Sequence, residues 1–233
     1  MSQPNPPTHH TITANQALLQ ELPWSDNVDF THARRGFIGT RPGAVIRNAS
    51  GRAVWSMQPF AFEEGDAPAP DSVNPSLWRQ AKLNALHGLF EVTDGIYQVR
   101  GFDLSNITFI EGRTGVIVID PLISAECAEA AIELYREHRG NRPVSAVVYT
   151  HSHVDHFGGI HGILSPEDIS SGAHILAPEG FLKEAASENV LVGNAMGRRA
   201  TYMYGSLLPK SPLGHVDAGL GKTVSMGSVA LVP

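Results

Sequence analysis

The chain has 233 residues, of which 42% are hydrophobic, and a formal net charge of −6 at pH 7. This length accommodates one large domain, or one domain with a preceding segment. The acidic balance argues against a general nucleic-acid binder, which needs a basic face, and no apolar run in the sequence approaches the roughly 20 residues of a membrane-spanning helix. The single cysteine, Cys127, excludes an internal disulfide.

The N-terminal segment MSQPNPPTHHT is polar and rich in proline. It lacks the basic start and apolar core of a secretory signal, so the sequence as it stands predicts a cytoplasmic protein; processing of the N-terminus would instead allow a periplasmic or secreted one. We expect residues 1–12 to be disordered and residues 13–22 to form a short helix. Residues 23–75 are expected to be irregular, with an acidic, proline-rich, exposed connector at 63–75.

From residue 74 the chain alternates helices and strands. Asn74 and Pro75 begin a helix that we expect to end at Gly88. Residues 89–92 and 96–99 flank an Asp-Gly turn and predict a β-hairpin. The other expected elements are strands at 106–110, 116–119, 144–149, 173–177 and 223–232, and helices at 125–138 and 180–186. Short helices interleaved with strands predict an α+β fold in which helices pack on a mixed sheet.

The segment 150–159, THSHVDHFGG, follows a predicted buried strand directly. Just after a strand the chain is still nearly extended, so residues two apart point the same way, and we predict that His151 and His153 bind one metal ion. Asp155 and His156 come where the chain begins to turn, and we predict that they bind a second ion beside the first. Imidazole nitrogen with one carboxylate is ligation that suits zinc.

Such a dinuclear site indicates a class of reaction. Two zinc ions that share a water lower its pKa towards neutrality and make hydroxide available as a nucleophile. Asp155 is the expected catalytic residue, because it would bind one ion and orient that hydroxide. Gly158 and Gly159 let the backbone pass close to the site. The alternative, a His-rich surface loop, does not explain why the cluster lies between a buried strand and a glycine pair.

The string THSHVDHFGGIHG resembles the signature of the metallo-β-lactamase superfamily. Two flanking segments are similar to the alkyl sulfatases of that superfamily: DSVNPSLWRQAKLNALHGLFEVTDGIYQVRGFDLSNITFIEG at 71–112 and NAMGRRATYMYGSLLP at 194–209. The resemblance covers about residues 13–233. It implies a metallo-β-lactamase-like αββα sandwich truncated to its N-terminal part, with an N-terminal lead-in at 1–88 and a catalytic domain, incomplete at its C-terminus, at 89–233.

The same resemblance implies a sulfuric ester hydrolase that converts small-molecule alkyl sulfates to alcohol and sulfate by a metal-bound hydroxide, and a homodimer when full-length. It assigns His151 and His153 to one Zn²⁺ ion, and Asp155 and His156 to the other. Two glutamate ligands, a further histidine and most sulfate-binding groups are expected beyond Pro233. The alternatives are an inactive truncated fragment of this fold, or another hydrolase of the superfamily, such as a thioesterase or a lactonase.

Three further residues have two interpretations each. His215 and Asp217, in GHVDAG, look like a ligand pair, but the resemblance to alkyl sulfatases puts the later ligands further along the chain, so we favour a structural role for His215. Asp120 ends a predicted strand that faces the cluster. It is either an acceptor that orients a ligand imidazole or a simple turn residue.

A polar group lies in the segment similar to alkyl sulfatases. Its members either line an entrance for sulfate, since arginine suits planar oxyanions, or form solvated surface, which is the commoner role of paired arginines. The residues concerned are Arg198, Arg199, Tyr202 and Tyr204.

Overall fold

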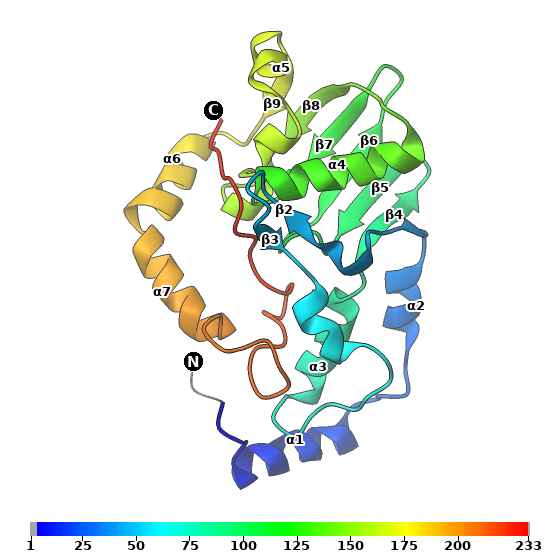
Figure 1. Cartoon of the computed structure of the whole chain (residues 1–233), viewed down its shortest axis with the longest axis vertical. Helices are drawn as coiled ribbons and strands as arrows, with labels where there is room; N and C mark the ends of the chain where they lie inside the picture. The colour runs from blue at the N-terminus through cyan, green and yellow to red at the C-terminus, as the bar shows by residue number, and fades with distance from the viewer. Residues whose placement is uncertain (1–3, 233) are drawn as a thin grey trace.

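The computed structural model describes residues 4–232. Seven strands form one mixed sheet in the order β1-β4-β5-β6-β7-β8-β9 (Figure 1). They are β1 (Phe37–Gly39), β4 (Gly88–Thr93), β5 (Ile96–Arg100), β6 (Ile107–Glu111), β7 (Val116–Ile119), β8 (Val144–Val148) and β9 (His174–Leu176). The first five strands in this order pair antiparallel, and β8 and β9 are added in parallel.

Helices and a two-stranded sheet flank the large sheet. The two short strands are β2 (Ile46–Arg47) and β3 (Ala53–Trp55). The α-helices are α1 (His9–Glu21), α2 (Val28–Arg34), α3 (Pro75–Asn84), α4 (Ala125–Arg139), α5 (Pro166–Ser170), α6 (Phe181–Ala186) and α7 (Gly193–Tyr204). The shorter turns are η1 (Pro42–Ala44), η2 (Gln58–Glu63), η3 (Val154–His156), η4 (Ile160–Gly162) and a π-helical turn, η5 (Ser187–Leu191). Within residues 4–232, every helix is too short or too polar to cross a membrane.

The main core lies between α4 and one face of the sheet. Alternate residues of the central strands are fully buried there: Tyr97, Val99, Ile107, Phe109, Val116 and Val118. The ring of Phe109 stacks on Tyr135 of α4 with 4.6 Å between centroids. The intervening residues of these strands are half-buried, which is typical of antiparallel strands covered on one face. The prediction of helices packed on a mixed sheet is therefore confirmed, and these layers correspond to the N-terminal part of the expected sandwich.

Most predicted elements agree with the structure. The hairpin is formed by β4 and β5, with Gly95 at φ +74° in its turn. The elements predicted between 106 and 186 match the observed ones to within one residue at each end. Strand β1 pairs with β4 across the expected boundary at 88/89, so the lead-in supplies an edge strand of the sheet. The division into a lead-in and a catalytic domain stays a prediction.

The predicted strand at 223–232 is wrong. The amide of Met226 donates to the carbonyl of Val54 (2.9 Å), and the amide of Ala230 donates to that of Gly158 (2.9 Å). The segment therefore crosses several separate parts of the molecule and pairs with no single strand. Its apolar residues resemble those of a strand, but its hydrogen bonds are spread along its path.

The expected disorder of residues 1–12 is wrong in part. Helix α1 begins at His9, where the side chain of Thr8 accepts a hydrogen bond from the amide of Thr11 (3.3 Å) and caps the helix. Residues 1–3 of the predicted segment lie outside the described residues.

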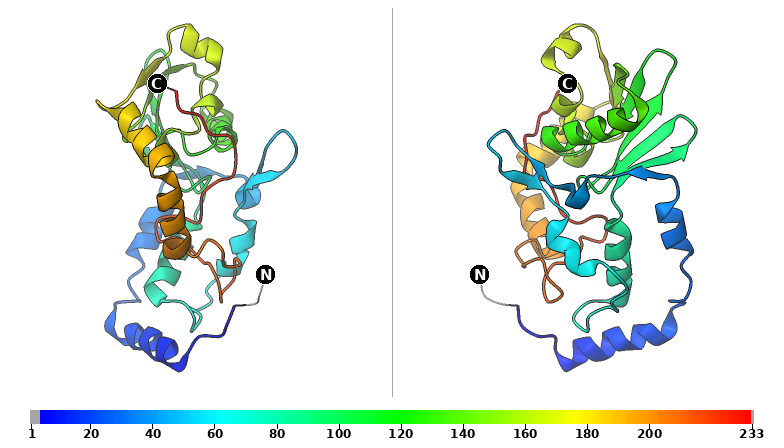
Figure 2. Two further views of the ribbon diagram at one scale, coloured as in Figure 1. Left: turned by 90° about the vertical axis from the view of Figure 1, so that its left-hand side faces the viewer. Right: turned by 45° about the vertical axis from the view of Figure 1, so that its right-hand side comes forward.

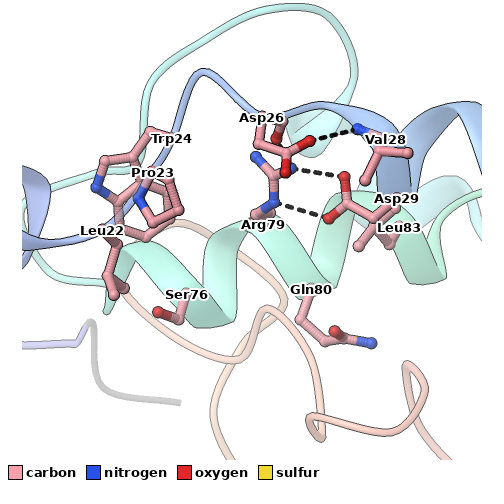
Figure 3. A pocket seen from close by; sticks show the side chains of 10 residues that line it. All are labelled: Leu22, Pro23, Trp24, Asp26, Val28, Asp29, Ser76, Arg79, Gln80 and Leu83. Carbon is pink, nitrogen blue, oxygen red and sulfur yellow. Dashed lines mark hydrogen bonds and ion pairs between the residues drawn. The ribbon is translucent and has the colours of Figure 1, made fainter.

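Helices α1 and α2 follow an outer path beside α3, whereas α6 and α7 run one after the other along another side (Figure 2). Arg79 of α3 fixes α2 through both carboxylate oxygens of Asp29, with Nε to Oδ2 at 2.8 Å and Nη2 to Oδ1 at 2.6 Å (Figure 3). These bonds from Arg79 hold the pKa of Asp29 below its usual value. A pocket of about 310 Å³ lies beside this pair, and its lining residues all come from positions 22–83.

A buried ionic cluster joins η2, α3 and the C-terminal segment. The ammonium of Lys222 contacts the carboxylate of Glu63, Oδ2 of Asp217 (3.2 Å) and the carbonyl of Ala81 (2.7 Å). The side chains of the three charged residues are at most 1% exposed. Burial raises the pKa of Glu63, although Lys222 acts in the opposite direction. The expected exposed connector at 63–75 is therefore wrong at Glu63, whose partner lies far along the chain.

Replacing Lys222 by methionine would leave two carboxylates in the core without their cation. We expect Lys222→Met to lower the free energy of unfolding by about 3–5 kcal/mol, the usual effect of removing one partner from a buried ionic pair. Urea denaturation measures this change. Lys183→Met, at a lysine whose side chain is 86% exposed, is the matched control and should leave stability unchanged. A loss below about 1 kcal/mol for Lys222→Met would contradict this account.

Candidate metal centre

The predicted metal loop leaves the carboxyl end of β8, next to the carboxyl end of the parallel strand β7. In open sheets of this kind the chemistry lies beyond these strand ends. After η3 the loop runs against the segment that follows β7, where the amide of Gly159 donates to the carbonyl of Leu122 (3.0 Å). A Cβ atom at Gly159 would overlap the carbonyl oxygen of Pro121, and one at Gly158 that of Ile123. The glycine pair thus permits a close approach of two backbones, as expected.

The four predicted ligand side chains lie next to one another. The ring of His151 is 4.0 Å from that of His156 and 4.6 Å from that of His153, between centroids. Oδ2 of Asp155 is 3.1 Å from Nε2 of His156. Among residues 4–232, no three His, Cys, Asp or Glu side chains are arranged to hold a metal ion. The donor set of three imidazoles and a carboxylate fits zinc, and the assignment of these four residues as ligands stays a proposal.

Asp120 orients two of the imidazoles. Its Oδ2 accepts hydrogen bonds from Nδ1 of His156 (2.8 Å) and from the hydroxyl of Thr150 (2.8 Å). Because the Thr150 hydrogen points to Asp120, the Thr150 oxygen accepts from Nδ1 of His151, 2.9 Å away. Both rings are therefore held at Nδ1, and Nε2 is the atom that each would offer to a metal ion; in His156 this nitrogen faces Oδ2 of Asp155, its proposed co-ligand. The interpretation of Asp120 as an acceptor for a predicted ligand is confirmed over that of a simple turn residue.

The backbone at Asp120 explains how its carboxylate reaches the loop. Its φ is +57°, in the left-handed region that aspartate tolerates better than most residues. Its Oδ1 also accepts from the amide of Thr150 (2.8 Å), and the residue is 8% exposed. The left-handed turn directs the carboxylate from β7 towards the loop after β8.

The carboxylates also act on the protonation of the imidazoles. Burial lowers the pKa of His156, but hydrogen bonds with Asp120 and Asp155 outweigh this effect and raise the pKa to about 9. Burial raises the pKa of Asp155, but the hydrogen bond from His156 outweighs it, so the net shift is downward. Burial and the neighbouring rings of His156 and His153 lower the pKa of His151. A metal ion bound at Nε2 of His156 would take the place of a proton there.

The segment Asp103–Ser105 supports the loop from the other side, a role that the sequence reasoning missed. The hydroxyl of Ser105 donates to the carbonyl of Asp155. The buried carboxylate of Asp103 accepts from the amide of Ile123 (3.2 Å) and from the hydroxyl of Ser225 (2.7 Å). The segment thus joins three parts of the chain. Its sequence signal was two polar residues in a short connection between strands, which is too common a pattern to be singled out.

His215 is bound at both ring nitrogens to backbone oxygens. Nδ1 lies 2.7 Å from the carbonyl of Tyr204, and Nε2 lies 2.7 Å from that of Lys222. The side chain is buried, and its neighbour Asp217 belongs to the ionic cluster around Lys222. These contacts agree with the favoured structural role and leave neither nitrogen for a metal ion.

The polar group on α7 is largely exposed. Arg198, Arg199 and Tyr202 lie on the surface, and Tyr202 is 85% exposed. Tyr204 is half-buried and lines a cavity of about 350 Å³ between α7 and the segment 215–224. The exposure of both arginines agrees with solvated surface, and a sulfate-binding role for this group stays a hypothesis.

Comparison with known proteins places these features in a family. Residues 100–232 match the family described as "Metallo-beta-lactamase superfamily". The chain is 53% identical to a linear primary-alkylsulfatase of Pseudomonas sp. over 98% of its own length and 34% of that protein. It is 50% identical to an alkyl/aryl-sulfatase of Saccharomyces cerevisiae over 95% of its length and 34% of that protein. The chain therefore spans about a third of the length of these curated relatives.

A solved structure agrees with this placement. The stereoselective inverting sec-alkylsulfatase Pisa1 from Pseudomonas sp. superposes with a TM-score of 0.92 at 45% identity. The match covers 99% of this chain and 36% of that one. The fold described above is thus that of the matching third of an alkylsulfatase structure.

The role of Asp120 leads to a direct prediction. In Asp120→Asn an NH₂ group replaces one carboxylate oxygen, so the side chain no longer accepts both from the Thr150 amide at Oδ1 and from His156 and the Thr150 hydroxyl at Oδ2. We expect zinc affinity to fall by about 10- to 100-fold, the usual effect of removing a partner that orients a ligand. Competition with a chromogenic chelator measures it. Asp94→Asn, in the exposed hairpin turn, is the control, and equal affinity in the two variants would refute the orienting role.

Proposed function

The chain belongs to the metallo-β-lactamase superfamily, and we propose that it is the N-terminal part of a zinc-dependent hydrolase of alkyl sulfate esters. The observation that carries this proposal is the 53% identity to a linear primary-alkylsulfatase over 98% of the chain. A second relative, 47% identical, is an (R)-specific secondary-alkylsulfatase. A sulfate ester of an alkyl alcohol is the substrate type that these names share.

The proximity of the four side chains in the loop after β8 supports the proposed roles. His151 and His153 hold one ion, and Asp155 and His156 hold the other. Bound zinc supplies Lewis acidity, which lowers the pKa of a coordinated water and polarises an ester oxygen. The carboxylate of Asp155 orients the attacking water, and Asp120 keeps two imidazoles in the correct tautomer. The homodimer and the cytoplasmic location expected from the sequence stay predictions.

The cavity beside α7 supports an alkyl substrate. Its volume of about 350 Å³ is within the range of small-molecule sites. Leu104, Leu220 and Val224 give it an apolar wall. Leu104 directly precedes Ser105, which binds the backbone of Asp155. Adjacent residues therefore form part of the cavity wall and hold the metal loop. An alkyl chain placed there would contact Leu104, the neighbour of a residue that binds the metal loop.

Sulfate release tests the proposal. A chimera in which this chain replaces the matching third of the Pseudomonas linear primary-alkylsulfatase should release sulfate from dodecyl sulfate. Chelation should abolish the release, and added zinc should restore it, because the nucleophile depends on the metal. His153→Ala should be inactive, whereas His174→Ala, at an exposed histidine of β9, should keep full activity.

Two outcomes would contradict parts of this proposal. Full activity of the His153→Ala chimera would refute the ligand assignment. A folded chimera that cleaves a lactone or a thioester but no alkyl sulfate would refute the substrate class. The 233-residue chain assayed alone decides between an active domain and the alternative of a non-catalytic fragment.

A further inference from the structure

His153 is held differently from the other two histidines of the loop. Its ring makes an edge contact with that of His151, and its Nε2 lies 3.3 Å from Oε1 of Glu188. The rings of His151 and His156 are instead bonded at Nδ1, through Thr150 and Asp120. A carboxylate from outside the metal loop thus faces Nε2 of His153, whereas the carboxylate that faces Nε2 of His156 belongs to its proposed co-ligand Asp155.

We propose that Glu188 is a positioning residue of the metal centre, which fixes the tautomer of His153 so that Nδ1 is the atom offered to the metal. A neutral imidazole carries one N–H, and that hydrogen is at Nε2 when a carboxylate accepts from Nε2. The lone pair is then on Nδ1. The inference rests on the proposed zinc centre and adds a residue to it from outside the metal loop.

The consequence is an asymmetry within the first ligand pair. His151 offers Nε2, the nitrogen far from the backbone, whereas His153 offers Nδ1, the nitrogen close to it. Two histidines that are two residues apart on one extended segment then reach a shared ion from rings in different orientations. The observed angle of 66° between the two ring planes agrees with such different orientations.

The turn that contains Glu188 follows a helix that packs against residues flanking the metal loop. It lies in the π-helical turn η5, closed by a hydrogen bond from the amide of Val192 to the carbonyl of Ser187 (3.0 Å). Such turns occur frequently at functional sites. The preceding helix α6 is anchored by Phe181, whose ring lies 5.2 Å from that of Tyr149 and 5.3 Å from that of Phe157.

Tyr149 and Phe157 flank the loop that bears the four predicted ligands. One aromatic cluster therefore fixes both ends of the loop and the start of the element that bears Glu188. This shared aromatic packing holds the Glu188 carboxylate next to His153.

The contact between His153 and Glu188 is not expected to stabilise the fold appreciably. The side chain of His153 is 58% exposed and that of Glu188 is 26% exposed. Pairs at this exposure contribute little to the free energy of unfolding because solvent and salt screen them. Substitutions at Glu188 should therefore leave the fold intact, which separates an effect on the metal centre from an effect on folding.

The test uses the 233-residue chain with three substitutions. Glu188→Leu removes the acceptor, Glu188→Gln keeps a neutral one, and Glu184→Leu is the control at an exposed glutamate one turn earlier. Nitrogen-15 NMR of the imidazoles, without added metal at pH 8, reports the tautomer of His153. We expect mainly Nε2–H in the unaltered chain, less in Glu188→Leu, and an intermediate value in Glu188→Gln.

Zinc titration against a competing chelator is the second measurement. We expect Glu188→Leu to weaken zinc binding by about tenfold or more, with Glu188→Gln affected less and the number of ions bound unchanged. An unchanged tautomer in Glu188→Leu, or an unchanged zinc affinity, would overturn the proposal. Loss of one ion would also overturn it, because Glu188 would then be a ligand. Absent zinc binding by the unaltered chain would favour the alternative of a non-catalytic fragment, while the tautomer still tests Glu188.

Discussion

Asp120 ends β7 in a left-handed conformation, and its carboxylate joins that strand to the loop that follows the parallel strand β8. Through His156 directly, and through Thr150 to His151, it sets which ring nitrogens are available. A loop with three imidazoles in six residues has many possible arrangements of its rings. Bonds from the sheet restrict them, so the chemistry of the loop depends on a residue that precedes it by thirty positions.

The fold was predictable where hydrogen bonding is regular. Alternating or continuous apolar runs, a turn signal between them and a helical period located β4 to β9, α4 and α6, because burial on one face imposes those periods. The segment 223–232 has a similar apolar content, but its amides bind separate neighbours that only the tertiary fold brings close. Helix α7 contains two glycines and buries no residue, so its sequence has little helical signal. Glu63 is buried because Lys222 reaches it from the other end of the chain.

The candidate site likewise has a part that the sequence predicts and a part that it does not. Its four proposed ligands are local in sequence, since the end of one strand brings them together, and a motif of six residues was enough to select them. The residues that hold them are not local. Ser105, Asp120 and Glu188 come from three different parts of the chain. Ser105 contacts the loop through one hydrogen bond, Asp120 through three and Glu188 through its carboxylate beside His153, and no sequence period signals these contacts. Only Asp120 was a candidate, because it ends a strand beside the cluster.

We propose that the loop after β8 binds zinc through the nitrogens that these partners leave free. The most direct test is an anomalous difference map, recorded at the zinc edge, from crystals of this chain grown with zinc. We expect one peak bonded to Nε2 of His151 and Nδ1 of His153, and a second at Asp155 and Nε2 of His156. Crystals that show zinc only at other residues, or zinc bound to Nε2 of His153, would contradict it.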